Sequence, residues 1–210
     1  MAKLKKQHMT IHWKAIVQDD SSIPATEATL KEKATLVGRV GLMMLSVGTG
    51  AWRVRNSMNK VARCLGITCT ADIGLLAISY TCIEGTDTYT QSISLPTTGV
   101  NTHKLMELEL FMKEFPDKVS TYSVKHIHEV LDEIQKLPAN YKAWNLGLAS
   151  ALACGAFTFL LGGGPVEMCC AFLGAGVGNF VRKKMLGHSI SLLANVAVSV
   201  AASCLVYVLT

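Results

Sequence analysis

The chain has 210 residues, of which 50% are hydrophobic and 17% charged, and its formal net charge is +5. This composition is too apolar for a typical soluble protein of this length and favours a membrane protein with an aqueous part. Basic residues are dispersed rather than clustered with aromatic residues, which argues against a nucleic-acid partner. The seven cysteines form no Cys-x-x-Cys pair, so free thiols in a reducing compartment are expected rather than a disulfide framework.

Residues 1–24 are expected to be a mobile N-terminal tail. The segment 1–6 is basic, but the residues up to Ser22 mix histidine, lysine and aspartate. Without an apolar core, this segment cannot serve as a signal peptide. The alternative interpretation is an amphipathic anchor on a membrane surface.

Residues 25–142 are predicted to form a cytoplasmic α+β domain. A helical pattern begins near Thr26 and continues to Leu65, and Gly48 and Gly50 predict a kink or a break into two helices. Gly66 is well placed to end the second helix, because glycine favours the conformation that follows a helix C-terminus.

After this helical region the pattern changes to one of period two. Residues 77–82 and 89–95 alternate between apolar and polar side chains on either side of a Glu-Gly-Thr-Asp turn, which predicts a β-hairpin. A helix capped by Asn101 or Thr102 is expected to end at about Phe115, before a proline.

A further helix is predicted from about Ser120 to Leu137. It carries metal-capable groups at helical spacing, namely His126, His128, Glu129 and Asp132. The second histidine of a zinc-protease helix is missing, so a solvated helix face is preferred to a metal site. There is also no Gly-x-Ser-x-Gly elbow and no Walker A sequence. No catalytic residue, metal or cofactor is therefore predicted.

Residues 143–210 are the predicted transmembrane domain. They contain only four formally charged residues, and a charge left in hydrocarbon costs several kcal/mol. Three apolar segments, near 143–161, 165–181 and 189–209, have the length of membrane-spanning helices. Buried helices of a soluble protein are the competing interpretation. The predicted fold class is an α-helical multi-pass membrane protein with about three spans and an N-terminal cytoplasmic α+β domain.

Basic residues predict the orientation of these spans. Lys136 and Lys142 precede the first span, and 182–184 is a run of three basic residues after the second, whereas the turn 162–165 has none. Basic residues favour the cytoplasmic side of a membrane, so the N-terminal domain is expected in the cytoplasm.

Polar and small residues within the spans suggest different roles. Glu167 is either a proton or cation site or a side chain that reaches interfacial water. Asn179 is interpreted as an interhelical hydrogen-bonding residue. Glycine and alanine recur at four-residue spacing in the first two spans, which indicates close helix packing. For Gly174 and Gly178, this packing interpretation is preferred to a nucleotide-binding loop.

The run from Gly48 to Gly66 resembles a segment of the threonine/serine exporter family, in which a glycine-rich turn leads into an Arg-Val-containing helix that ends at Leu-Gly. The order of the later segments is also similar, so the resemblance covers approximately Leu36 to Leu209. Two features depart from the family. Arg55 stands where a glutamate commonly follows Arg-Val, and further membrane helices usually follow the third span. The chain is therefore expected to be a fragment or a shortened subunit.

The resemblance implies a subunit of a secondary-active exporter in the cell membrane, surrounded by lipid and acting on small polar metabolites. These would be threonine- or serine-like amino acids, or a dicarboxylate such as succinate. Self-association or a second small membrane subunit is expected to complete the pathway. The candidate substrate or gating residues are Arg53, Asn101, Glu167 and Asn179. The alternatives are a membrane-anchored enzyme or sensor with its site in the cytoplasmic domain, and a non-transporting assembly subunit.

Overall fold

The computed structural model describes residues 11–17, 23–95, 98–138, 141–185 and 192–209. The chain divides into two compact units, residues 1–138 (unit 1) and 139–210 (unit 2). Over the described residues the chain is mostly helical, with seven α-helices and one three-stranded antiparallel sheet. The expectation of a mainly helical chain with a small β element is thus confirmed.

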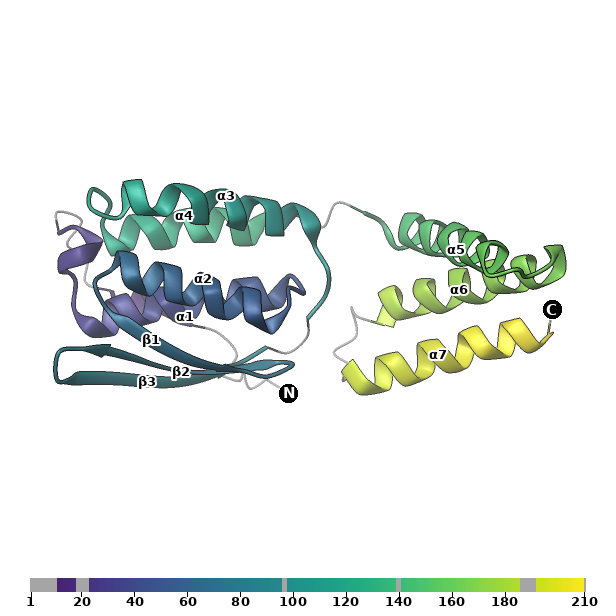
Figure 1. Ribbon diagram of the computed structural model, residues 1–210, viewed down its shortest axis with the longest axis horizontal. Helices are drawn as coiled ribbons and strands as arrows, with labels where there is room; N and C mark the ends of the chain where they lie inside the picture. The colour runs from purple at the N-terminus through teal and green to yellow at the C-terminus, as the bar shows by residue number, and fades with distance from the viewer. Residues whose placement is uncertain (1–10, 18–22, 96–97, 139–140, 186–191, 210) are drawn as a thin grey trace, which may run out of the picture. The chain divides into compact units, whose positions relative to one another are not determined.

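Unit 1 is built in three layers (Figure 1). Helices α1 (Leu30–Ser46) and α2 (Ala51–Cys64) form the middle layer. The sheet covers one side of this layer, while α3 (Thr102–Lys118) and α4 (Val124–Lys136) cover the other. Because α1 has neighbours on both sides, it is buried along nearly its whole length, from Glu32 to Leu45.

The ends of α1 and α2 follow local signals. The hydroxyl of Thr29 accepts a hydrogen bond from the backbone N–H of Glu32 at 3.4 Å, and the Glu32 carboxylate accepts one from the backbone N–H of Thr29 at 3.0 Å. This capping box starts α1. Gly48 and Gly66, with φ of 80° and 74°, adopt the left-handed conformation that favours glycine. The predicted break and the predicted end of α2 are therefore confirmed.

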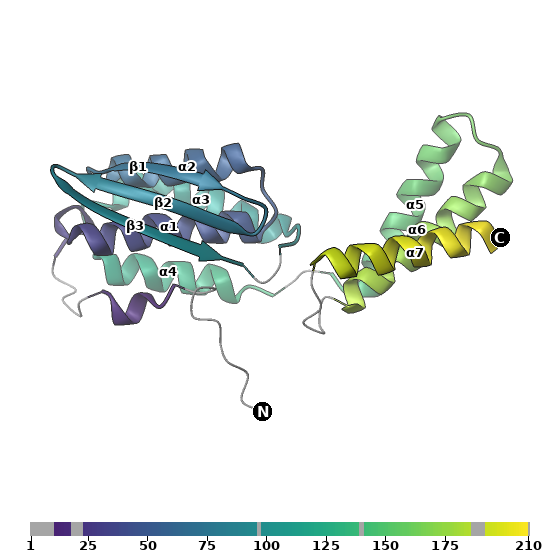
Figure 2. The same cartoon turned by 90° about the horizontal axis from the view of Figure 1, so that it is seen from below.

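The sheet contains β1 (Thr68–Ile73), β2 (Ala77–Glu84) and β3 (Asp87–Ser94) in the order β1-β2-β3, all antiparallel (Figure 2). Strands β2 and β3 confirm the predicted hairpin. Strand β1 was not predicted. This strand lies at the edge of the sheet, and Cys69 is its only fully buried residue. Apolar and polar residues therefore alternate only weakly along its sequence.

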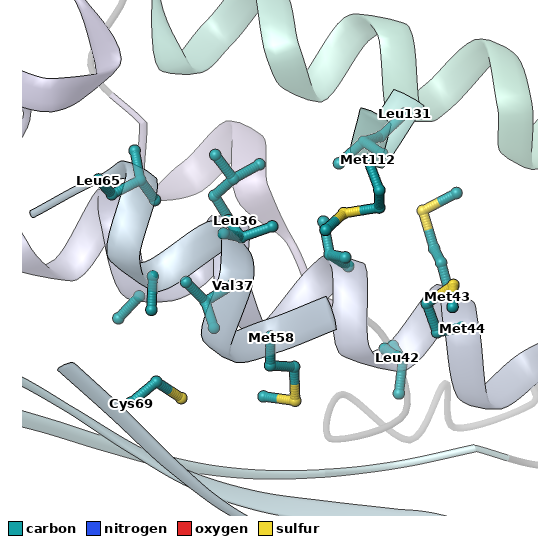
Figure 3. Packing of buried hydrophobic residues seen from close by; sticks show 14 of the residues in the cluster. Leu36, Val37, Leu42, Met43, Met44, Met58, Leu65, Cys69, Met112 and Leu131 are labelled. Carbon is teal, nitrogen blue, oxygen red and sulfur yellow. The ribbon is translucent and has the colours of Figure 1, made fainter. Parts of the chain in front are cut away.

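The core of unit 1 joins all three layers. Figure 3 shows side chains from α1 and α2 packed between Cys69 on β1 and Met112 and Leu131 on the outer helices. On the sheet side, Tyr80 lies directly against Gly38 of α1: a Cβ atom at Gly38 would lie 2.2 Å from the Tyr80 hydroxyl oxygen. That hydroxyl donates to Gln91 Oε1 at 2.8 Å, so the tyrosine is held in place.

The close approach of Tyr80 makes Gly38 sensitive to substitution. Gly38→Ala is expected to lower the free energy of unfolding of unit 1 by about 1–3 kcal/mol, the usual cost of overpacking a core. Hydrogen exchange of the α1 amides in the intact chain measures this change. Gly99→Ala is the matched control, since a Cβ there meets nothing within 4 Å. Equal losses of stability in the two variants would show that the close approach of Tyr80 does not make Gly38 sensitive to substitution.

Helix α3 continues through Pro116 to Lys118, although the sequence predicted its end at about Phe115. Proline has no N–H to donate to the carbonyl oxygen four residues earlier, which here belongs to Met112. The ammonium of Lys60 on α2 donates to this oxygen at 2.6 Å. The expected helix end was wrong because a distant lysine replaces the missing hydrogen bond.

Unit 2 contains α5 (Ala143–Leu160), α6 (Pro165–Met185) and α7 (Leu192–Leu209). Helix α6 extends beyond the expected end at residue 181, and the expected start of the third segment at residue 189 lies outside the described residues. Over the part of the chain that the structure describes, no helix combines the length and the apolar character needed to cross a membrane. This differs from the expectation of three spans.

The described part of unit 2 has an unusual interior. All of its buried residues are small or polar: Gly147, Ala151, Gly155, Cys170, Gly174, Gly178, Asn195 and Ser199. Glycine allows the helices to approach closely. A Cβ at Gly147 would lie 3.3 Å from the carbonyl oxygen of Gly176, and one at Gly178 would lie 3.0 Å from that of Ser199. The helices of unit 2 therefore pack backbone to backbone.

Candidate functional site

Arg53 lies on α2 with its side chain about half exposed. Its guanidinium pairs with the Glu109 carboxylate on α3 at 3.2 Å, and both side chains are open to solvent. The guanidinium also lies over the ring of Trp52, 5.9 Å from the ring centroid. An exposed pair of this kind contributes little to stability.

Asn101 has a structural role that the sequence predicted. Its side-chain oxygen accepts from the backbone N–H of Lys104 at 3.1 Å and caps α3. Its own backbone N–H donates to the carbonyl oxygen of Val47 at 3.2 Å, and Gly99 makes a similar bond to Ser46 at 3.3 Å. The segment before α3 is thus tied to the turn that follows α1.

The two candidates in unit 2 both lie on α6. Glu167 is exposed in the first turn of the helix. Asn179 donates from Nδ2 to the carbonyl oxygen of Leu146 on α5 at 3.5 Å, a weak contact in line with the expected interhelical role. Twelve residues of helix separate them by about 18 Å along the axis. The structure therefore does not bring Glu167 and Asn179 together.

A cluster that the sequence did not predict lies between α1, α4 and the N-terminal segment. Five side chains form this Arg39 cluster: Trp13, Arg39, His128, Asp132 and Gln135. The guanidinium of Arg39 donates to the backbone oxygen of His128 at 2.8 Å, to Gln135 Oε1 at 3.2 Å and to the Asp132 carboxylate. Arg39 is 4% exposed.

Trp13 closes the Arg39 cluster from outside. Its ring stacks on the His128 imidazole with centroids 4.9 Å apart, and its indole Nε1 donates to Asp132 Oδ1 at 3.3 Å. Trp13 is only 7% exposed and belongs to a short 3-10 helix, Trp13–Ala15. The segment 11–17 of the expected mobile tail is therefore packed against α4 through this side chain.

The protonation of His128 follows from its neighbours. Its Nδ1 lies 3.1 Å from an Arg39 nitrogen, and because a guanidinium can only donate, Nδ1 accepts and Nε2 carries the proton. This Nε2 is buried without a partner among the described residues. Burial, reinforced by the charge of Arg39, lowers the pKa of His128 to about 3. The imidazole is therefore neutral near pH 7.

The two charged partners are shifted as well. Burial lowers the pKa of the Arg39 guanidinium, and Asp132 opposes this shift. Burial alone would raise the pKa of Asp132, but the hydrogen bond and the charge of Arg39 hold it below its ordinary value. All of these contacts stabilise an ion pair, and the cluster contains no serine, threonine, cysteine or lysine side chain. The arrangement is a structural clamp.

The expectation of a solvated face on α4 was wrong at His128, which is fully buried, and at Asp132, which binds Arg39. His126 and Glu129 are half exposed, as expected for a solvated face, and His126 Nδ1 lies 4.0 Å from Glu129 Oε2. No three metal-capable side chains converge within the described residues. The only sequence signal for the cluster was Arg39 itself, a lone charge in an apolar helical run.

A row of polar side chains runs along the contact between α6 and α7. The Nδ2 of Asn195 donates to the carbonyl oxygen of Arg182 at 3.3 Å, and the hydroxyl of Ser203 donates to that of Gly174 at 2.8 Å. Asn195 is 1% exposed, and its Oδ1 has no partner among the described residues. These side chains join the two helices by hydrogen bonds in a unit whose described buried residues are small or polar.

A two-unit helical chain whose second unit buries small residues and exposes apolar ones suits the class of membrane transport proteins. Residues 35–210 match the ThrE family model, described as "Putative threonine/serine exporter". The chain belongs to this family, which confirms the resemblance seen in the sequence. No curated protein and no solved structure matches the chain. Membership places the chain among exporters and implies a membrane location.

Proposed function

We propose that this chain is a subunit of a secondary-active exporter that moves small polar metabolites out of the cytoplasm. The substrates would be threonine- or serine-like amino acids, or a dicarboxylate such as succinate. The family match over residues 35–210 supports export as the activity. A transmembrane proton gradient would supply the energy.

The main support for this proposal is that unit 2 reverses the burial pattern of a water-soluble protein. Small and polar residues lie inside it, while large apolar side chains point outward. Phe157, Phe159, Leu160, Leu193 and Val208 are 65–80% exposed. Apolar surface on this scale requires a non-aqueous neighbour, and helices in lipid pack through small residues because lipid tails are as apolar as leucine. Helices α5, α6 and α7 would therefore lie against lipid through these exposed side chains.

The basic end of α6 supports an orientation for this unit. Arg182, Lys183 and Lys184 lie in its last turn, and basic residues favour the cytoplasmic side. Unit 1 would then also be cytoplasmic. Arg53 and Asn101 remain gating candidates in unit 1, and Glu167 and Asn179 remain substrate candidates in unit 2. Further copies or a second small membrane subunit would complete the pathway.

Transport by the reconstituted chain tests the proposal. Vesicles that contain the full chain and a co-expressed partner subunit are expected to show saturable flux of labelled threonine, serine or succinate under a pH gradient. Gly178→Leu is expected to abolish this flux, because a Cβ at Gly178 already lies 2.8 Å from Ser203 Cβ and a larger side chain would separate α6 from α7.

Val198→Leu is the matched control, since Val198 on α7 is 47% exposed and a larger apolar side chain fits a lipid-facing position. This variant should keep the flux of the unmodified chain. No saturable flux of any of the three solutes would count against an exporter. Equal loss in the two variants would count against the proposed membrane packing.

A further inference from the structure

A groove of about 490 Å³ lies on unit 1 between α3 and α4. Apolar side chains from both helices line it, including Phe111 on α3 and Val130 and Ile134 on α4. It is separate from the Arg39 cluster, whose side chains do not line it. The proposed export activity gives this surface no role.

The groove is long rather than compact. Its lining on α3 runs from His103 to Lys118, which corresponds to about 22 Å at 1.5 Å per residue. A small metabolite would fill only a fraction of this length. A helix of about four turns would match the length of the groove, and the surface between two neighbouring helices can accommodate a third helix.

The charged side chains around the groove indicate which charge a ligand bound there should carry. Three carboxylates, Glu107, Glu114 and Glu133, line it together with one ammonium, Lys118. Lys118 already pairs with Glu114 at 2.6 Å. Glu107 and Glu133 form no ion pair with the described residues and belong to opposite walls. The surplus negative charge favours lysine and arginine and disfavours anionic ligands.

An apolar side chain at the groove is left uncovered. Leu110 lines the groove and is 47% exposed, and Met106, one turn earlier on α3, is 52% exposed. An apolar floor between two acidic walls is complementary to a helix that carries leucine-type residues on one face and basic residues beside them.

We propose that the α3–α4 groove binds a basic amphipathic helix of a partner protein. The apolar face of that helix would cover Leu110, Phe111 and Val130. Its lysine or arginine residues would pair with Glu107 on one wall and Glu133 on the other. This inference concerns unit 1 and does not depend on what the chain exports.

The test uses the full chain in nanodiscs of phosphatidylcholine, which carries no net charge. The probe is a fluorescently labelled helical peptide of about five turns made of leucine and lysine at amphipathic spacing. A scrambled peptide of the same composition is the control, and empty nanodiscs give the lipid background. Fluorescence anisotropy is expected to show saturable binding of the amphipathic peptide above both controls.

Charge reversal in the groove gives the decisive comparison. Glu133→Lys is expected to weaken binding about tenfold, because it removes one attraction and adds a repulsion. Glu129→Lys changes the net charge equally on the same helix but lies outside the groove, so binding should change less than about twofold. Both residues are exposed, and circular dichroism confirms that each variant is folded.

Three results would overturn the proposal. The amphipathic peptide could fail to bind, it could bind no better than the scrambled peptide, or the two charge reversals could weaken binding equally. The first two outcomes would exclude a helix site. The third would show that only the overall charge of unit 1 attracts the peptide.

Discussion

Replacement of Arg39 by alanine is expected to lower the free energy of unfolding of unit 1 by about 3 kcal/mol. The change removes four hydrogen-bond contacts, to the Nδ1 and the backbone oxygen of His128, to Asp132 and to Gln135, and leaves Asp132 charged beside the buried His128. Breaking a buried pair costs more than the pair contributes, because the remaining charge loses its compensation. Asp132 keeps some access to solvent, with its side chain 26% exposed, which places the cost at the lower end for such pairs.

Hydrogen exchange of the α1 and α4 amides in the intact chain reports this free energy. Arg63→Ala on α2 is the control, since Arg63 is exposed and, among the described residues, its Nε donates to the carbonyl oxygen of Asn59 within the same helix. That substitution should change stability by about 0.5 kcal/mol or less. Similar losses in both variants would show that the Arg39 cluster does not hold α1 and α4 together.

Unit 1 is also expected to lose stability as the pH falls from 6.5 to about 4.5, with a slope approaching 1.4 kcal/mol per pH unit. The pKa of His128 is lowered from 6.5 to about 3 in the folded chain. In this range the unfolded chain binds a proton at His128 and the folded chain does not. The unfolded state is therefore favoured as the pH decreases, and the full contribution of the neutral imidazole is present above pH 6.5.

His128→Gln should reduce this slope, and His126→Gln is the control, because His126 is half exposed on the same helix and lies outside the Arg39 cluster. Asp132 does not interfere in this window. Burial raises its pKa, but the hydrogen bond and the charge of Arg39 hold this pKa below its ordinary value, so the contribution of Asp132 is lost only at lower pH. The stability of each variant is followed by urea titration at a series of pH values. A slope that is the same in the chain with and without His128 would refute the assignment.

Local signals in the sequence were sufficient for most helices and for the hairpin. The glycines that end α1 and α2, the Asn101 cap of α3 and the period of α4 all act within a few residues, so they can be recognised without a structure. The errors have long-range causes. The end of α3 depends on Lys60, whose contact with Met112 joins positions 52 residues apart.

The Arg39 cluster could not be predicted for the same reason. Arg39 and Asp132 are 93 residues apart, and Trp13 and Asp132 are 119 residues apart. No periodicity connects such positions, and a lone arginine in an apolar run shows only that a partner must exist. The candidates Arg53, Asn101, Glu167 and Asn179 were chosen for residue type. The structure gives Arg53, Asn101 and Asn179 a partner each and does not bring Glu167 and Asn179 together.

Helix α1 connects both outer layers of unit 1 through charged side chains. Lys33 reaches Glu84 on β2 at 2.5 Å, and Arg39 reaches Asp132 on α4. The two residues are about 9 Å apart along the helix. A displacement of α4 must therefore either break the Arg39–Asp132 pair or carry α1 with it, and α1 in turn pulls on β2. These two ion pairs link the three layers of unit 1 mechanically, so a force applied to its outer helices is transmitted to the sheet.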